Sequence, residues 1–106
     1  MRVLLDENLP HDLAGALLGQ PVLTVHQLGW AGVKNGELLH RPAGQFDAFI
    51  TIYANLLSQQ RLQERPFGVI VLRARSNRMT DLLPLVDPIL AALAALHPGV
   101  VQHVGA

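Results

Sequence analysis

Two adjacent carboxylates, Asp6 and Glu7, follow the first apolar run of the chain, and Asn8 comes directly after them. The run (Arg-Val-Leu-Leu, residues 2–5) predicts a buried strand that ends at these polar residues. Mg²⁺ takes one or two carboxylates and keeps several waters, which makes Asp6 a candidate first ligand. Adjacent strand residues point to opposite faces, so both acids could face one metal only if the strand has already ended.

Helix capping is the alternative interpretation of this acidic pair. Pro10 is well placed near the start of a helix, and the helix dipole favours an acid close before it. Residue types alone favour capping over metal binding. The pair is therefore a candidate site that needs further support.

Other acids differ in what their positions allow. Glu37 stands at the expected start of a short helix, where a site role and a first-turn acid favoured by the dipole are equally supported. Asp47 opens the expected third strand, about 20 Å from the carboxyl edge at the usual rise per residue, so we exclude it from a site there. Asp81 is expected to cap a helix.

The chain has one local basic patch, formed by Arg73, Arg75 and Arg78 around Ser76 and Asn77. It directly follows the most convincing strand pattern, residues 67–72 (Phe-Gly-Val-Ile-Val-Leu). Guanidinium groups bind phosphate oxygens in pairs, so the patch could hold a phosphate. A solvated loop with its arginines paired to nearby acids is the equally supported alternative.

Several classes of site are not indicated. The five histidines show no zinc-binding spacing, the glycines form no phosphate-binding loop, and neither serine lies in a nucleophile elbow. The absence of cysteine excludes disulfides and thiolate metal sites. Eight Lys and Arg balance eight Asp and Glu, so any nucleic acid would have to be held by a local patch.

Length and composition predict one small domain. The chain has 106 residues, half of them apolar, which is enough for a single core spanning residues 1–106. It shows neither a signal-peptide pattern nor an apolar run long enough to cross a membrane. We therefore expect a cytoplasmic protein without a membrane partner.

Apolar runs and helical patterns alternate along the sequence. The expected strands are residues 2–5, 22–25, 46–53, 67–72 and 100–104. The expected helices are residues 11–18, 34–39, 56–64 and 80–96, the last one capped by Thr80 and Asp81 and holding Pro84 and Pro88 in its first turns or at a kink. This order predicts an α/β fold with a mostly parallel sheet of about five strands covered on both faces. Ligands of such sheets bind at the carboxyl ends of the strands, near a topological switch point.

Five segments, in this order, resemble a family of small bacterial PIN-like proteins that are described as toxin components. They are Val-Leu-Leu-Asp-Glu-Asn-Leu-Pro (3–10), Leu-Gly-Trp-Ala-Gly-Val-Lys-Asn-Gly-Glu-Leu-Leu (28–39), Phe-Asp-Ala-Phe-Ile-Thr (46–51), Asn-Leu-Leu-Ser-Gln-Gln (55–60) and Val-Leu-Arg-Ala-Arg-Ser-Asn-Arg (71–78). The resemblance covers nearly the whole chain. It implies a three-layer α/β/α fold and, in active members, a ribonuclease that uses Mg²⁺ or Mn²⁺ to activate water.

The resemblance also assigns roles to individual residues. Asp6 and Glu37 match the first two acids that hold the metal, and Glu7 accompanies Asp6 in the catalytic group. RNA would be contacted by Arg73, Arg75 and Asn77, with Asn8, Tyr53 and Asn55 at the edge of the site. The implied partners are RNA, an antitoxin-like protein and a second copy of the chain.

One position departs from the family pattern. The third acid normally stands in Thr-x-Asp-Arg-Asn-Leu, but residues 51–56 read Thr-Ile-Tyr-Ala-Asn-Leu, which places Tyr53 where the aspartate is expected. A phenol with an ordinary pKa near 10 is neutral at pH 7 and a poor Mg²⁺ ligand. We therefore expect either a ribonuclease with an impaired acidic site or, as the alternative, a PIN-like domain that no longer cuts and binds protein or RNA.

Overall fold

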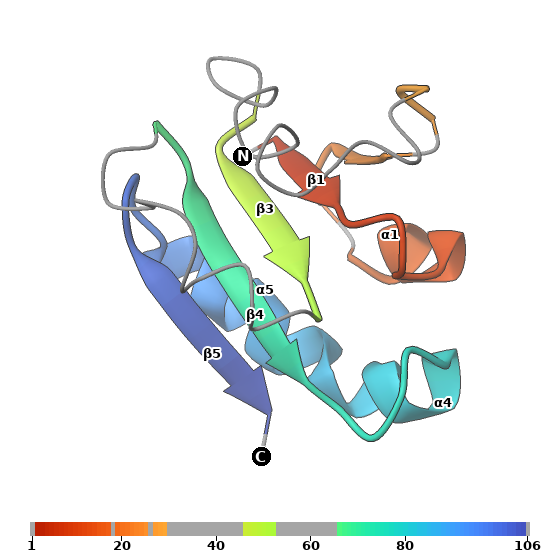
Figure 1. The fold of residues 1–106 in the computed structure, drawn as a ribbon. Helices are drawn as coiled ribbons and strands as arrows, with labels where there is room; N and C mark the ends of the chain where they lie inside the picture. The colour runs from red at the N-terminus through yellow and green to blue at the C-terminus, as the bar shows by residue number, and fades with distance from the viewer. Residues whose placement is uncertain (1, 18, 26, 30–45, 53–65, 106) are drawn as a thin grey trace.

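Five parallel strands form one sheet in the order β2-β1-β3-β4-β5 (Figure 1). The computed structural model describes residues 2–17, 19–25, 27–29, 46–52 and 66–105, and all structural statements concern these residues. The strands are β1 (Val3–Leu5), β2 (Val22–Thr24), β3 (Ala48–Thr51), β4 (Gly68–Arg73) and β5 (Val101–Gly105). The prediction of an α/β fold with a parallel sheet is confirmed.

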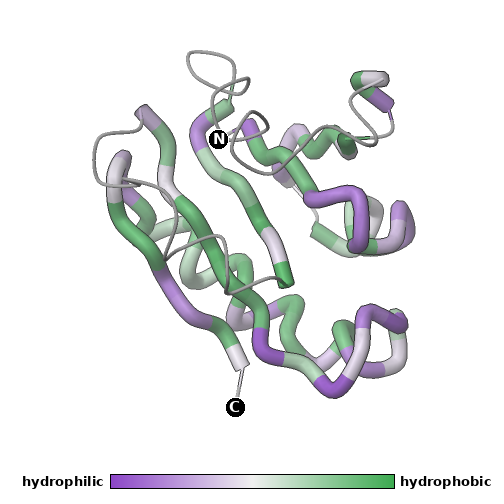
Figure 2. The backbone as a smooth tube through the Cα atoms, in the orientation of Figure 1, coloured by the Kyte–Doolittle hydropathy of each residue, from purple (hydrophilic) through white to green (hydrophobic). Residues whose placement is uncertain are grey.

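The central strands are continuous apolar runs because both of their faces are buried. Every residue of β1 and β3, and five of the six residues of β4, is buried. Hydrophobic residues follow the strands along most of their length (Figure 2). The strand predicted at residues 46–53 is shorter, since β3 begins at Ala48 and ends at Thr51.

The described helices pack on one face of the sheet. They are α1 (His11–Ala16), α4 (Met79–Leu82), a 3₁₀ turn η2 (Leu83–Leu85) and α5 (Val86–Ala95). Buried leucine and isoleucine side chains from α1, α4 and α5 meet one face of the central strands in a single core cluster. The second face carries its own buried cluster, in which Phe49 and Phe67 are the largest fully buried side chains. The helices predicted at residues 34–39 and 56–64 lie outside the described residues.

The helix predicted at residues 80–96 is divided by a 3₁₀ turn that contains Pro84, a residue that has no N–H to donate within a helix. Pro84 lies in η2, and Pro88 lies in the first turn of α5. The predicted cap was wrong: α4 begins at Met79 after Arg78, and no capping side chain binds its first turn. Asp81 instead accepts a hydrogen bond from Ser76 Oγ (2.6 Å), which fixes the loop before the helix.

The helices of two crossover connections cover the same face of the sheet, but the two connections run toward opposite edges of the sheet. α1 connects β1 to β2 at one edge, whereas α4 and α5 connect β4 to β5 at the other edge. The two crossovers therefore have opposite hands, although a right-handed crossover is the strong rule. The arrangement places α4 in contact with α1. This contact between the two helices brings the loop after β4, which contains Asn77, beside the loop after β1, which contains Asn8.

The outer edge of β2 is closed locally by Thr24 and Gln27. The Thr24 N–H donates to Gln27 Oε1 (2.9 Å), and the Gln27 N–H donates to Thr24 Oγ1 (3.1 Å). This reciprocal pair is a capping box. The Leu28 N–H also donates to the Thr24 carbonyl (3.2 Å), so both backbone groups of Thr24 are occupied.

Gly68 is required at the start of β4 by close packing. A Cβ at this position would meet Leu96 Cγ, and would lie 2.7 Å from Leu96 Cδ2 and 2.8 Å from the His97 carbonyl oxygen. We expect Gly68→Ala to lower the free energy of unfolding by about 1–3 kcal/mol, because the added methyl overpacks a site bounded by backbone. Urea denaturation measures the change.

The matched control is Gly15→Ala in α1, where a Cβ meets nothing within 4 Å. Alanine is the better helix former, so this variant should gain about 0.5–1 kcal/mol. Equal effects of the two substitutions would contradict the packing assigned to Gly68.

Candidate functional site

The candidate site lies where β1 and β3 end side by side. The chain runs from β1 to β2 on one side of β1 and returns to β3 on the other, so the strand order reverses between β1 and β3. For this order, ligands bind outside the carboxyl ends of the strands at that reversal. Asp6 directly follows β1, and Thr51 is the last residue of β3.

The carboxylate of Asp6 is buried at this reversal. Its side chain is 3% exposed, and Oδ2 accepts a hydrogen bond of 2.8 Å from Thr51 Oγ1. The backbone N–H groups of Glu7 and Asn8 also donate to the carboxylate. The Leu9 N–H donates to the Asp6 carbonyl (3.0 Å), so the chain turns as soon as the strand ends. Because β1 ends at Leu5, Asp6 and Glu7 are not forced to point to opposite faces of the sheet.

These contacts contradict helix capping by Asp6. The residue before α1 is Pro10, which supplies no side-chain capping bond, and the carboxylate of Asp6 is bonded to Thr51 and to its own turn. Burial raises the pKa of Asp6 above its ordinary value of 3.8, while the hydrogen bond from Thr51 opposes the rise. Within the described residues, no cationic side chain forms an ion pair with Asp6. A bound cation would remove this cost of ionisation.

The loop after β4 is tied to the loop after β1. The side-chain amide of Asn77 donates to the Asn8 carbonyl oxygen over 2.7 Å. The Arg78 N–H donates to Ser76 Oγ (3.1 Å), which in turn binds Asp81. Asn77, predicted to contact RNA, thus already uses its amide to join the two loops.

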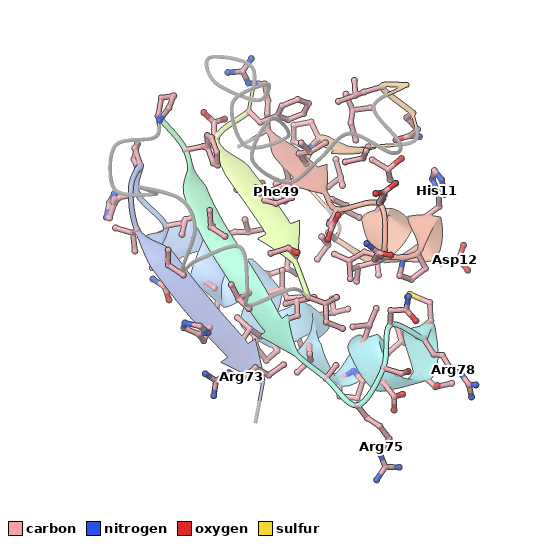
Figure 3. The ribbon with its side chains drawn as sticks, viewed as in Figure 1. His11, Asp12, Phe49, Arg73, Arg75 and Arg78 are labelled. Carbon is pink, nitrogen blue, oxygen red and sulfur yellow. The ribbon has the colours of Figure 1, made fainter. Side chains whose placement is uncertain are left out.

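The three arginines lie at the carboxyl edge but do not converge on Asp6. Arg73, Arg75 and Arg78 are all exposed, and Figure 3 shows the side chains of Arg75 and Arg78 directed outward. In the part of the chain that the structure describes, none of them pairs with a carboxylate, so the predicted pairing with acids is not found. They form an exposed basic rim beside the site.

The described residues hold only part of the predicted acidic group. Glu37, Tyr53 and Asn55 lie outside them, and among residues 2–17, 19–25, 27–29, 46–52 and 66–105 no three His, Asp or Glu side chains gather closely enough to hold a metal. Asp6, with Glu7 next to it, supplies one or two carboxylates, which is the number that Mg²⁺ takes from a protein. Asp47 is excluded as predicted, since its Oδ2 accepts the Arg2 N–H (2.8 Å) at the opposite end of the strands.

Thr51 is the contact that sequence reasoning missed. The only signal was a hydroxyl at the end of an otherwise apolar strand, Ala-Phe-Ile-Thr. A fully buried hydroxyl requires a hydrogen-bond partner. That partner could be named only once β1 and β3 were known to be neighbours.

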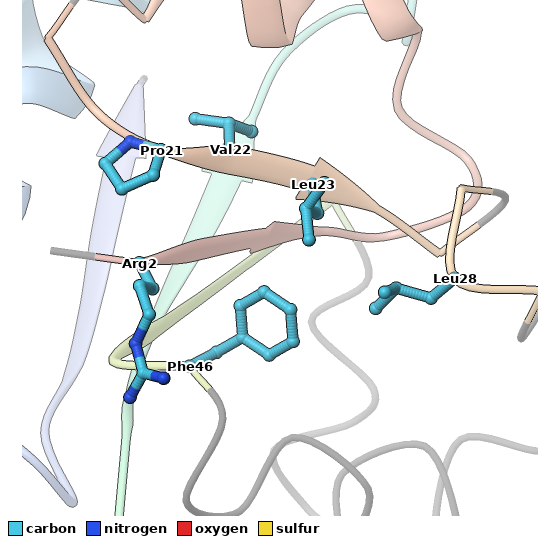
Figure 4. Close-up of a pocket in the computed structure, with 6 residues that line it drawn as sticks. All are labelled: Arg2, Pro21, Val22, Leu23, Leu28 and Phe46. Carbon is cyan, nitrogen blue, oxygen red and sulfur yellow. The ribbon is translucent and has the colours of Figure 1, made fainter.

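A hollow elsewhere in the molecule carries no comparable chemistry. It has a volume of about 490 Å³ and is lined by Arg2, Pro21, Val22, Leu23, Leu28 and Phe46 (Figure 4). Its lining is apolar apart from Arg2, whose Nε lies 3.7 Å from Asp47 Oδ2. Because the amino-terminal ends of β1 and β2 contribute to it, this hollow does not include Asp6.

Comparison of the chain with models of protein families, with curated proteins and with solved structures finds no match. None of the described helices is long and apolar enough to cross a membrane.

The raised pKa of Asp6 leads us to expect a pH-dependent stability in the metal-free protein. Below pH 3.8 the carboxyl is neutral in both the folded and unfolded chain, so its favourable contribution is fully present there. As the pH rises through the folded pKa, that contribution is lost, by about 1.4 kcal/mol for each unit of upward shift. We therefore expect Asp6→Asn to gain stability relative to the native chain between pH 4 and pH 7, measured by urea denaturation. The exposed Asp12→Asn is the control, and an unchanged difference across this range would contradict the assignment.

Proposed function

We propose that the chain is a PIN-like, metal-dependent ribonuclease with a weakened acidic site. The observation that supports this most is the position of Asp6, a buried carboxylate beside Thr51 at the strand-order reversal. Burying a carboxylate without a cation costs stability, and buried acids with perturbed pKa values cluster at functional sites. A divalent cation at this position would explain why the acid is there.

In this proposal each described residue has a distinct task. Asp6 would hold Mg²⁺ or Mn²⁺, and Thr51 fixes the orientation of its carboxylate through one oxygen. The metal would lower the pKa of a bound water and stabilise charge on the phosphate. The exposed arginines at the same edge would hold the RNA backbone, while Asn77 keeps their loop against the β1 loop.

The alternative is a PIN-like domain that no longer cuts and binds RNA or an antitoxin-like protein. Tyr53 favours it, because the family pattern has an aspartate at that position. The two proposals differ in whether the native chain binds a divalent cation through Asp6. Metal binding is therefore the measurement that separates them.

Calorimetric titration with Mn²⁺ tests the proposal. We expect the native chain to bind one Mn²⁺ with a Kd in the range of roughly 1–100 μM, and Asp6→Asn to weaken binding at least about a hundredfold. Asp12→Asn is the matched control, since Asp12 is an exposed acid in the first turn of α1. Its affinity should equal that of the native chain.

Cleavage of a fluorescent single-stranded RNA in Mn²⁺ is the second readout. Activity that is lost in Asp6→Asn and kept in Asp12→Asn would support the ribonuclease. If the native chain binds no Mn²⁺, or if Asp6→Asn binds it as well as the native chain does, the ribonuclease proposal fails and the non-cutting domain is favoured.

A further inference from the structure

The outer edge of β5 offers backbone groups that nothing in the described structure pairs. The Val69 N–H donates to the Val100 carbonyl (2.9 Å), and Val71 is in register with His103. Because bonding alternates along a parallel pair, His103 and its second neighbours, Val101 and Gly105, direct their N–H and C=O groups away from β4. In Figure 1, β5 is the outermost strand of the sheet.

Among the described residues, this edge shows none of the features that normally keep an edge strand from pairing. Such strands are protected by charged side chains, proline, bulges or a covering segment. β5 reads Val-Gln-His-Val-Gly, with no Lys, Glu, Asp, Arg or Pro. The opposite edge differs, because the Thr24–Gln27 capping box occupies the backbone of Thr24 there.

A shallow groove runs beside this free edge, between α5 and β5. It has a volume of about 420 Å³ and is lined by Pro88, Ala91, Ala92, Ala95 and residues 102–105. Ala91 and Ala95 are exposed on α5 although alanine is small and apolar. The lining contains no carboxylate, lysine or arginine, so it would not select a strongly charged partner.

We propose that a second copy of this chain pairs with β5 in antiparallel orientation, about a two-fold axis at His103. This inference is independent of the proposed ribonuclease. In that register His103 lies opposite His103 of the second copy, and Val101 lies opposite Gly105. Val101, His103 and Gly105, whose backbone groups face outward, would therefore each lie opposite another outward-facing residue. A shift by one pair along the strand would leave an end residue without a partner.

The side chains also fit this register. Gly105, which has a φ of +107°, carries no side chain that could project toward the Val101 side chain of the other copy. Because the axis is perpendicular to the sheet, the two α5 helices lie on the same face, and the small side chains of Ala91 and Ala95 allow them to approach across the axis. The formal net charge of zero means that two copies do not repel each other strongly.

Single cysteines test the pairing, because the chain has none of its own. His103→Cys would place two thiols across the axis at a Cα separation of about 5.5 Å, which is within the range that a disulfide spans. Gln102→Cys is the matched control, since its position would lie opposite Val104. Under mild oxidation, we expect His103→Cys to form a disulfide-linked dimer at least about tenfold faster than Gln102→Cys.

Sedimentation equilibrium of the full chain provides a test without cysteine chemistry. We expect the native chain to form a dimer with a Kd on the order of 10 μM. Ala91→Lys would bring two like charges together near the axis and should raise this Kd at least about tenfold. Ala94→Lys, at an exposed position of α5 that does not line the groove, should leave it unchanged.

Two results would overturn the proposal. One is a native chain that stays monomeric at about 100 μM, roughly tenfold above the expected Kd. The other is a dimer that Ala91→Lys does not weaken and in which cysteines at 103 and 102 cross-link at equal rates. Either result would show that β5 is not the surface through which two copies associate.

Discussion

Tyr53→Asp is expected to raise the rate of RNA cleavage in Mn²⁺ by about a hundredfold or more and to tighten Mn²⁺ binding. The substitution restores the carboxylate of the Thr-x-Asp pattern that begins at Thr51, the residue that binds Asp6. A second carboxylate offsets the dehydration of the metal, and one positioned charge can be worth several kcal/mol in the transition state. Fluorescent RNA cleavage and Mn²⁺ calorimetry measure the two effects.

Tyr53→Asn is the matched control for this gain. It removes the same phenol and has nearly the same shape as aspartate, but it adds no charge. We expect it to leave cleavage and Mn²⁺ affinity close to those of the native chain. If Tyr53→Asn and Tyr53→Asp gain equally, the loss of the ring rather than the carboxylate is responsible. If neither gains, the family pattern does not describe this site.

Phe49→Ala is expected to lower the free energy of unfolding by about 3–5 kcal/mol. Phe49 lies in the middle of β3, is fully buried and belongs to the core cluster on the second face of the sheet (Figure 3). Removing its ring leaves a cavity on the second face of the sheet, which the hydrogen-bonded strands cannot shift to fill. The total stability of a domain is only about 5–15 kcal/mol, so the variant should unfold at markedly lower urea concentration.

Leu23→Ala provides the comparison, because its side chain is 41% exposed on the edge strand β2. We expect this change to cost less than about 1 kcal/mol. Both variants should be measured by urea denaturation with the slope of the transition reported. A loss in Phe49→Ala no larger than that in Leu23→Ala would show that the second cluster contributes little to stability.

The sequence predicted the strands well because each is a short apolar run closed by polar or turn residues. It could not define their ends. The run at residues 46–53 was extended through Tyr53, whereas β3 ends at Thr51, because apolar composition does not stop where the pairing with β1 and β4 stops. The prediction that Pro84 and Pro88 lie in first turns or at a kink is confirmed, since Pro84 lies in the 3₁₀ turn and Pro88 in the first turn of α5. The predicted Thr80 and Asp81 cap was wrong because Ser76 holds Asp81 from outside the helix.

The candidate site could be located but not assembled from the sequence. The predicted strand ends placed Asp6, Glu7 and the loop with Arg73, Arg75 and Arg78 at one edge of the sheet. In the structure these residues lie at the carboxyl ends of β1 and β4, which are parallel. The pairing of Asp6 with Thr51, and of Asn77 with the Asn8 carbonyl, joins residues 45 and 69 positions apart. Such contacts depend on strand order and on the hand of the crossovers, neither of which local patterns contain. The roles of Glu37, Tyr53 and Asn55 remain predictions.

The occupied backbone groups of Thr24 at the edge of β2 bear on how large an assembly the proposed pairing would form. A sheet with two open edges can add molecules at both ends and grow into a fibre, whereas a two-fold pairing of one open edge consumes it in both copies. After two chains joined at β5, the ends of the ten-stranded sheet would be the two β2 strands, each only three residues long and occupied at Thr24. The occupied groups of Thr24 would oppose growth beyond the dimer. Gln27→Ala removes the side chain that accepts the Thr24 N–H, so this variant should expose that group at the edge of β2 and allow further chains to pair there.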